Sequence, residues 1–344
     1  MATTPLLAGV DGGNTKTLAL VCDLDGWPIG IGRGGSSNWE AVGAEPAAGV
    51  IAQTVQRALE GAGGAWHDIE YAHMGLAGVD WPEDIPRMET ALRDAGWKCR
   101  LSLENDAFSA IRVCTTTGYG IGVTAGTGVA SGIVRPSGET FFYGAYTDLG
   151  GGWEINQAVV HAIVRAGDGR GEHTALAPAL LAVTGHATVS DLVYDMHRRD
   201  LRLESRVLRP LLFSVAAQGD PVAVCIVTNF GRQLALCAIN LIHRYKLEQV
   251  EVEVVAAGTL FMRTGPLLFD VFRSRLAEVA PRAKPILADC PPLMGAVRGA
   301  LMLSGTYSPE VWKRLNDEIG RRDWLREYSA VEAKEGDDGE GTQT

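Results

Sequence analysis

Two segments of the chain repeat one pattern, in which a short apolar run is followed by a loop of Gly, Thr and polar residues and then by a second apolar run. The first loop is Gly12-Gly13-Asn14-Thr15-Lys16, after the run 6–10, and the second is Gly126-Thr127-Gly128, after the run 121–124. Such a repeat indicates a duplicated supersecondary unit. A chain of 344 residues also exceeds what one hydrophobic core usually supports. We therefore expect two α/β halves, each beginning with a hairpin, that face each other across a cleft.

The predicted elements alternate as an α/β fold requires. Apolar runs and apolar residues at helical spacing predict, in the first half, strands over residues 6–10, 15–23, 28–34, 69–75 and 99–104 and helices over 47–61, 85–95 and from Ala107. The second half is predicted to have strands over 121–124, 129–134, 250–256 and 285–287 and a helical stretch over 150–245 with breaks at Pro210 and at Gly219-Asp220-Pro221, followed by helices through Phe272 and from Leu293. We expect domains over 1–118 and 119–328, the last helix packing back on the first domain, and a disordered acidic tail over 329–344.

Composition excludes several classes of protein. The net charge of −10 argues against a nucleic-acid binder, which needs a basic surface. We expect no membrane association, because no uninterrupted apolar run reaches the length of a membrane span. The cysteines stand singly, without a C-x-x-C pair, as is typical of reduced thiols. These features predict a cytoplasmic protein.

The first loop matches neither a Walker A loop nor a dinucleotide fingerprint, because a strand and not a helix follows it. The carboxylate before this loop, Asp11, is placed to hold Mg²⁺ beside phosphates. The loop itself is placed to donate hydrogen bonds to phosphate oxygens. An ordinary hairpin turn explains the same residues equally well. The second loop, with Thr127 and Gly128, is likewise either a phosphate-binding loop or a hairpin turn. Gly258-Thr259 after a late strand suits a flat purine, or is a plain strand-to-helix turn.

Three further positions carry polar chemistry. Asp106 follows the strand 99–104, where it is either a helix N-cap or a base that takes a proton from a substrate hydroxyl. Asn38 and Asp148 stand next to glycines, as suits a polyhydroxylated ligand, although loops commonly carry such residues.

Taken in order, the motifs resemble one family. They are "GVDGGNTKT", "GSSN", "GLAGVDWPED", "ENDAFSA", "TAGTG", "DGRGEHTAL", "AAGTLF" and "CPPLMGAVRGAL". The chain resembles, over about residues 6–305, the BadF/BadG/BcrA/BcrD-type ATPases and within them the N-acetylglucosamine kinase-like branch of the actin, hexokinase and heat-shock-protein-70 superfamily. The resemblance implies an α/β fold of two ribonuclease-H-like (actin-like ATPase) domains with an interdomain cleft.

The resemblance also implies the roles of individual residues. It implies an ATP-dependent sugar kinase that acts on an N-acetylhexosamine or a related amino sugar, with Asp106 as general base and Asp11 near Mg²⁺. The residues that match the nucleotide-binding positions are Gly12, Gly13, Asn14, Thr15, Lys16, Thr127, Gly128, Ala216, Gly258 and Thr259, and those that match sugar-contacting positions are Asn38, Asp106, Val129, Ala130 and Asp148. A homodimer is expected on the resemblance alone.

One departure and two alternatives bear on the function. Leu149 stands where the branch usually has a Glu, so we expect another amino sugar or a different polyol as the substrate. An ATPase activator of a benzoyl-CoA reductase or 2-hydroxyacyl-CoA dehydratase shares the fold and would bridge an iron–sulfur cluster between subunits. A binding protein that kept the fold without the chemistry is the other alternative.

Overall fold

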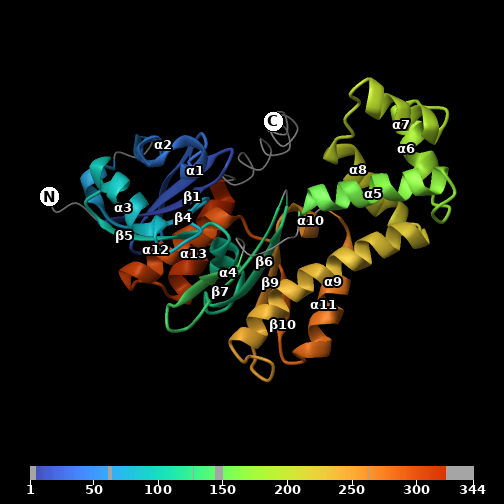
Figure 1. The fold of residues 1–344 in the computed structure, drawn as a ribbon. Helices are drawn as coiled ribbons and strands as arrows, with labels where there is room; N and C mark the ends of the chain where they lie inside the picture. Colours follow the sequence, from blue (N-terminus) through green and yellow to red (C-terminus); the bar gives the residue numbers. More distant parts are fainter. Residues whose placement is uncertain (1–4, 61–63, 127, 144–149, 263, 323–344) are drawn as a thin grey trace. The chain divides into compact units, whose positions relative to one another are not determined.

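The computed structural model describes residues 5–60, 64–126, 128–143, 150–262 and 264–322. The predicted acidic tail therefore lies outside the described residues. The described chain divides into two compact units (Figure 1). Unit 1 takes its residues from 1–120, 133–142 and 289–344, and unit 2 from 121–132 and 143–288.

Unit 1 is built on a five-stranded sheet in the order β3-β2-β1-β4-β5. Its strands are β1 (Leu6–Gly12), β2 (Thr17–Asp23), β3 (Pro28–Gly34), β4 (Ile69–Leu76) and β5 (Arg100–Asn105). The first three strands form an antiparallel meander, whereas β4 and β5 run parallel to β1. The carboxyl ends of β1, β4 and β5 therefore meet at one edge of the sheet, where ligands bind in open α/β sheets.

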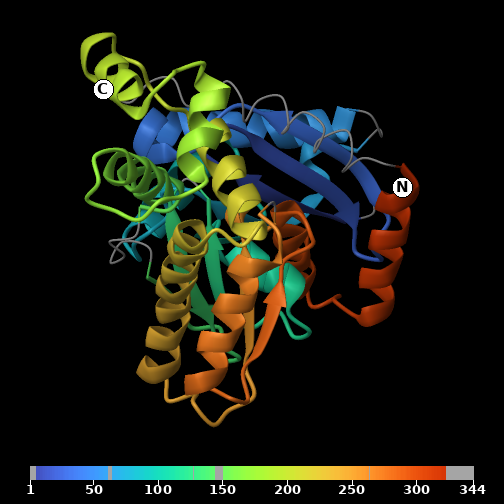
Figure 2. The ribbon, with the colours of Figure 1, turned by 90° about the vertical axis from the view of Figure 1, so that its right-hand side faces the viewer.

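Helices cover both faces of this sheet. They are α1 (Trp39–Val42), α2 (Ala44–Glu60), the 3₁₀ turn η1 (Trp66–Asp68), α3 (Asp84–Asp94), α4 (Phe108–Cys114), α12 (Pro292–Ser304) and α13 (Pro309–Arg322). Side chains alternate along β1, so Leu6, Ala8 and Val10 join the core under α2 and α3 while Leu7 joins the core under α12 and α13. Figure 2 shows α13, in red, beside the blue strands of this unit.

Glycine lets α12 approach the sheet closely. A Cβ atom on Gly9 would lie 2.4 Å from the backbone nitrogen of Val297, and one on Gly295 would lie 2.0 Å from the carbonyl oxygen of Ser109. Only a residue without a side chain fits at such contacts. The last helices that the structure describes, α12 and α13, are thus part of unit 1.

The second sheet has the order β10-β9-β6-β7-β8, which is the order of the first sheet read in reverse. Its strands are β6 (Gly120–Ala125), β7 (Val129–Val134), β8 (Thr140–Phe142), β9 (Glu253–Ala257) and β10 (Lys284–Leu287). Here β9 is parallel to both β6 and β10. The repeat predicted from the two Gly/Thr loops therefore extends to the topology of the sheets.

The remaining helices belong to unit 2. They are α5 (Gly152–Gly167), α6 (Leu176–Thr184), α7 (Val189–Arg198), α8 (Ser205–Ala217), α9 (Pro221–Arg244), α10 (Thr259–Met262) and α11 (Pro266–Val279). By length and composition α9 could cross a membrane, with a mean hydropathy of 1.7, but half of that window is buried. It packs against α8 and α11, so burial within the unit accounts for its apolar character.

The predicted break at Gly219-Asp220-Pro221 is confirmed, because α8 ends at Ala217 and the Asp220 side chain accepts from the Ala223 amide at 2.9 Å to cap α9. The predicted break at Pro210 is wrong. Pro210 lies inside α8, which continues because Leu208, Leu212 and Phe213 on either side of it are buried.

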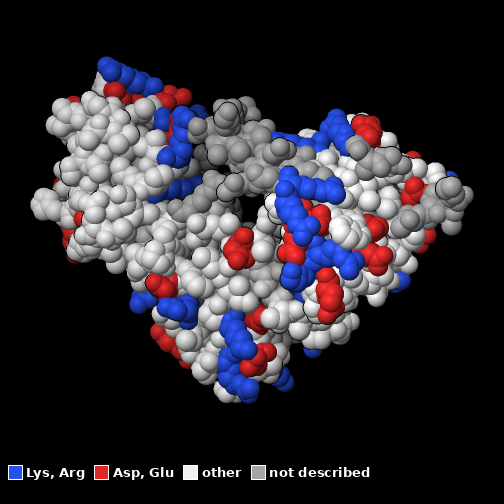
Figure 3. Space-filling model, turned by 180° about the vertical axis from the view of Figure 1, so that it is seen from behind, with Lys and Arg blue, Asp and Glu red and all other residues white. Residues whose placement is uncertain are grey.

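On the face that Figure 3 shows, Lys and Arg lie beside Asp and Glu wherever charged residues occur, and a large part of the face is uncharged.

Candidate functional site

The first Gly/Thr loop is the tip of the β1–β2 hairpin. Gly12 pairs with Thr17 in register, and the Gly13 amide donates to the Lys16 carbonyl at 2.9 Å, which closes the turn. The predicted strand from residue 15 therefore begins only at Thr17. Asn14 and Thr15 are exposed at the tip, where their polar groups can meet a ligand.

Residues 35–38 fasten this loop from one side. The Ser37 amide donates to the Gly13 carbonyl at 3.2 Å, and the Thr17 hydroxyl donates to the Gly35 carbonyl at 2.7 Å. The Asn38 amide nitrogen donates to Asn14 Oδ1 at 2.5 Å, while Asn38 Oδ1 accepts from the Glu40 amide. The position predicted to contact sugar is thus bonded to the loop predicted to contact phosphate.

Asp106 lies in the turn between β5 and α4, half-buried. The Ser109 amide donates to its carbonyl oxygen at 3.1 Å, and a Cβ atom on Gly75 would lie 3.3 Å from its Cα atom. The interpretation of Asp106 as a helix N-cap is wrong, since α4 begins at Phe108 and its N-cap is Ala107.

The neighbouring Asn105 ties this turn to the loop after β4. Its Nδ2 atom donates to Asp80 Oδ1 at 2.7 Å, and its Oδ1 atom accepts from the Ala107 amide at 2.9 Å. Asp84, buried at the start of α3, in turn accepts from the amides of Asp80 and Trp81 at 3.1 and 2.8 Å. Side chains therefore connect the ends of β4 and β5.

Burial and the negative charge of Asp80 raise the pKa of Asp106 to about 6, although hydrogen bonds from backbone amides at Ala107 and Asp106 itself oppose the shift. The pKa of Asp80 is raised as well, by burial and by the charges of Glu40 and Asp84, against the hydrogen bond from Asn105. A carboxylate with a pKa near neutrality is suited to accept a proton from a substrate.

Asp11 is the penultimate residue of β1 and pairs in register with Gly75 of β4, the glycine that also abuts Asp106. The two carboxylate residues thus flank one glycine at the same sheet edge. Among the described residues, no three His, Cys, Asp or Glu side chains are grouped to hold a metal ion. The pair of carboxylates, Asp11 and Asp106, still fits Mg²⁺, because this ion is commonly bound through one or two carboxylates together with water and substrate phosphates.

In unit 2 the second Gly/Thr loop meets two other segments. The Gly126 amide donates to the Gly128 carbonyl, and the Gly126 carbonyl accepts from the Gly152 amide at the start of α5, both at 2.9 Å. A Cβ atom on Gly126 would lie 3.8 Å from Thr259 Oγ1. The second loop, the N-terminus of α5 and the predicted adenosine turn therefore lie together.

Gly258 makes the closest approach in this group. Its φ is +93°, and a Cβ atom there would lie 2.4 Å from the Ala125 carbonyl oxygen. At Gly128 a Cβ atom would meet nothing within 4 Å. Backbone amides beside open space at a helix N-terminus are suited to bind phosphate.

The remaining predicted nucleotide and sugar positions lie in β7, in α8 or outside the described residues. Val129 is buried and Ala130 half-buried at the start of β7. Ala216 is buried near the end of α8, whose partners are α5, α6 and α9. Thr127, Asp148 and Leu149 lie outside the described residues.

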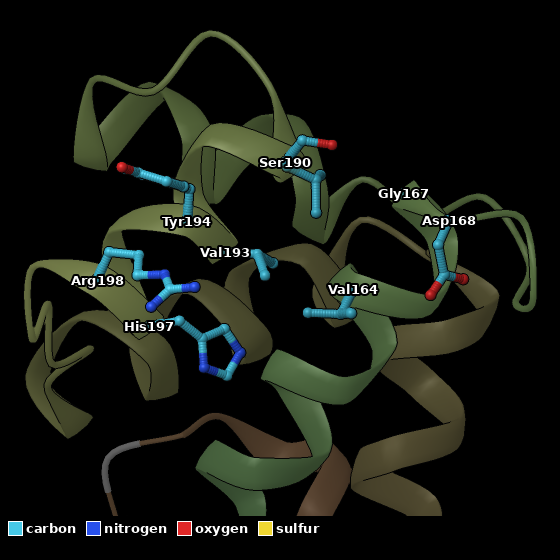
Figure 4. Close-up of a pocket in the computed structure, with 9 residues that line it drawn as sticks. Val164, Gly167, Asp168, Ser190, Val193, Tyr194, His197 and Arg198 are labelled. Carbon is cyan, nitrogen blue, oxygen red and sulfur yellow. The ribbon is translucent and has the colours of Figure 1, made fainter.

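One pocket lies elsewhere in unit 2, between α5 and α7 (Figure 4). Asp168, Tyr194, His197 and Arg198 are among its nine described lining residues, none of which is a predicted site residue.

Two sets of residues escaped the sequence interpretation. One is Asp80, which stands two residues after Gly78 in the quoted motif "GLAGVDWPED". The other is the buried carboxylate of Glu104, which His73 Nε2 and Arg112 Nη2 contact at 3.0 and 2.9 Å. Burial disfavours the charge of Glu104, but these two partners together bring its pKa down to about 2. Polar residues at every second position of β5 were the signal for this cluster.

The chain is similar in sequence to two sugar kinases over most of its length. An N-acetyl-D-glucosamine kinase of Dictyostelium discoideum is 26% identical over 313 residues, which are 86% of this chain and 98% of that protein. An N-acetylmuramic acid/N-acetylglucosamine kinase of Clostridium acetobutylicum is 26% identical over 294 residues, 84% of this chain and 96% of that protein.

Solved structures show the same fold. A Chromobacterium violaceum protein assigned to the N-acetylglucosamine kinases matches with a TM-score of 0.59 and 25% identity, over 86% of this chain and 99% of that chain. A ROK family glucokinase from Streptomyces griseus, in complex with glucose and AMPPNP, matches with a TM-score of 0.52 and 19% identity, over 87% and 98% of the two chains. The predicted fold class, two actin-like ATPase domains, is confirmed.

The family model for the BadF/BadG/BcrA/BcrD ATPases matches residues 8–303, which include both Gly/Thr loops, Asp106 and the turn at Gly258. The match covers most of the chain and includes the carboxyl edge of each sheet. The chain therefore belongs to the BadF/BadG/BcrA/BcrD ATPase family.

Proposed function

We propose that the protein is an ATP-dependent sugar kinase, which transfers the γ-phosphate of ATP to a hydroxyl of an N-acetylhexosamine or a related amino sugar. The observation that carries the proposal is Asp106, a half-buried carboxylate at the carboxyl edge of the first sheet whose pKa is raised to about 6. The near full-length similarity to two N-acetylglucosamine kinases supports the same reaction.

Asp106 acts as the general base. Its carboxylate accepts the proton of the sugar hydroxyl while the hydroxyl oxygen bonds to the γ-phosphorus and the bond from that phosphorus to the β,γ-bridging oxygen of ATP breaks. The products are ADP, a sugar phosphate and the proton held on Asp106. Positioning and neutralisation of charge supply most of the catalysis in reactions of this kind.

The two loops bind the phosphates. The residues that contact them are Gly12, Gly13, Asn14, Thr15 and Lys16 of the first loop and Thr127 and Gly128 of the second. The open space beside Gly128 and the N-terminus of α5 next to Gly126 support the second assignment. Asp11 holds Mg²⁺, which neutralises phosphate charge when bound.

Adenosine and sugar take the remaining positions. Gly258, Thr259 and Ala216 contact the adenosine, for which the tight turn at Gly258 is the supporting feature. Asn38, Val129, Ala130 and Asp148 contact the sugar. The bond between Asn38 and Asn14 supports a sugar position adjacent to the phosphate loop of unit 1.

A panel of sugars tests the proposal. ADP release is measured with ATP and Mg²⁺ in the presence of N-acetylglucosamine, glucosamine, N-acetylmuramic acid or glucose. We expect turnover that depends on an amino sugar. ATP hydrolysis that is unaffected by every sugar, in a purified protein that contains iron and is brown, would instead support the activator function.

A further inference from the structure

We propose that Asp80 is a positioning residue for the transfer reaction, which holds the turn that carries Asp106 through the side chain of Asn105 and supplies a negative charge beside it. This inference rests on the proposed function for its kinetic consequences. Its electrostatic part concerns two carboxylates of unit 1 and is independent of the substrate.

The geometric part follows from a chain of hydrogen bonds. Asp80 accepts from Asn105 Nδ2 at 2.7 Å, so the Asn105 amide is oriented with Oδ1 toward the Ala107 amide, 2.9 Å away. Those two bonds fix the residues on both sides of Asp106. A side chain held by its chain neighbours loses little entropy when it adopts the reactive geometry.

Asp80 is itself held from α3. Asp84 accepts from the Asp80 and Trp81 amides, and its side chain is buried. These bonds fix the backbone of the loop after β4. The Asp80 carboxylate is therefore preorganised to accept from Asn105.

The charge part follows from what surrounds the pair. The groups that act on Asp80 are Glu40 from α1 and Asp84 from α3, both acidic, together with the neutral Asn105. Among the described residues, Asp80 is the charged side chain that acts on Asp106, and backbone amides oppose its effect. Removal of the Asp80 charge therefore favours the ionised form of Asp106 and lowers its pKa.

Two substitutions separate these parts. In Asp80→Asn the amide oxygen can still accept from Asn105 but the charge is gone, whereas Asp80→Ala removes both. Glu83→Gln is the matched control, because it removes an exposed negative charge from the same loop. Thermal unfolding of each variant checks the fold.

Kinetics use ATP and the panel sugar with the fastest turnover. We expect Asp80→Ala to lower kcat about 10-fold to 100-fold through misplacement of Asp106, with KM for the sugar changed less than about threefold. Asp80→Asn should restore most of kcat, and the acidic limb of its kcat/KM profile should lie at lower pH than that of the wild type. Glu83→Gln keeps the wild-type profile. Unchanged kcat in Asp80→Ala, or a loss confined to KM, would overturn the positioning role.

Should Asp80→Ala fail to fold, Asn105→Ala tests the same link, because it leaves Asp80 in place and is expected to lower kcat similarly. A carbon-13 titration of the carboxyl groups tests the charge part without any turnover, with the Asp106 signal assigned from its loss in Asp106→Asn. We expect the Asp106 signal to titrate near pH 6 in the wild type and lower in Asp80→Asn. An identical titration in both proteins would contradict the inference even if the sugar panel succeeds.

Discussion

In unit 1 the loop after β1 is held by side chains as well as by its backbone, whereas the bonds that the described residues show for the loop after β6 in unit 2 come from the backbone. Asn38, Ser37 and Thr17 bond the first loop or its flanks to the segment that follows β3. The second loop is held by amide and carbonyl groups of Gly126, Gly128 and Gly152 and lies against a turn that only glycine fits. The two sheets nevertheless have the same strand order.

This difference agrees with the proposed position of the general base, Asp106, in unit 1 and of the adenosine turn in unit 2. A reacting hydroxyl must be placed within hydrogen-bond reach of one carboxylate, which takes specific side chains. Phosphates and a purine can be bound by main-chain amides, for which small residues are enough. Substitutions of side chains in unit 1 should therefore affect chemistry and stability, and added side chains in unit 2 should affect packing and nucleotide binding.

The largest effect is expected in unit 1 from Asp106→Asn. Loss of the base should lower kcat about 10²-fold to 10⁴-fold. The raised pKa of Asp106 means that folding favours its neutral form, so that its contribution to stability is full at low pH and is lost as pH rises through about 6. At pH 7.5 the neutral Asn should therefore raise Tm. Full turnover in this variant would remove Asp106 from its proposed role.

Glu104→Gln tests the side-chain network beneath the same edge. Because it leaves Arg112 and His73 without their carboxylate, we expect a loss of about 3 kcal/mol in the free energy of unfolding at pH 7. The pKa of Glu104 is lowered to about 2, so its stabilisation is present above its ordinary value of 4.5 and is lost as pH falls toward 2. The difference between variant and wild type should shrink over that range. Glu139→Gln, which removes an exposed ion pair with Arg135, is the control and should leave Tm unchanged.

In unit 2 two alanine substitutions separate packing from binding. Gly258→Ala places a Cβ atom against Ala125 at a positive φ and should cost about 1–3 kcal/mol of stability. In Gly128→Ala the added Cβ atom lies in open space, so Tm should be unchanged. The same atom would obstruct the proposed phosphate position, so KM for ATP should rise. Urea unfolding and ATP titrations measure the two effects. Equal loss of stability in both would mean that the second loop is not open as described.

The smallest effect is expected from the bond between Asn14 and Asn38. Asn14→Ala leaves the Asn38 amide without this acceptor, and we expect KM for the sugar to rise about threefold. Asn14→Asp keeps an acceptor oxygen, so it should preserve KM for the sugar but raise KM for ATP by repelling phosphate. If both variants change only the ATP constant, the bond has no role in sugar binding.

Much of the fold could be predicted because its signals are local. Alternating or continuous apolar runs located β1, β3, β4, β5 and β7 to within a residue or two, and the break at Gly219-Asp220-Pro221 located the start of α9. The short strand β8 (Thr140–Phe142) carried no such signal, because a three-residue strand has no period to detect.

The site was less accessible, since its contacts join residues far apart in the sequence. Asp80 meets Asn105 only because β4 and β5 are parallel with Leu76 opposite Asn105, a register that no local pattern specifies. Packing of α12 on β1 likewise depends on Gly9 and Gly295, whose close approaches no local pattern in the sequence indicates. The raised pKa of Asp106 follows from such contacts and could not be predicted before they were known.

Identification of the phosphorylated product tests the central proposal most directly. Phosphorus-31 NMR of the protein with ATP, Mg²⁺ and an amino sugar distinguishes a sugar phosphate ester from inorganic phosphate. We expect an ester signal that grows in step with ADP, requires the sugar and grows about 10²-fold to 10⁴-fold more slowly with Asp106→Asn. Inorganic phosphate as the sole product, at a rate that the sugar does not change, would contradict it.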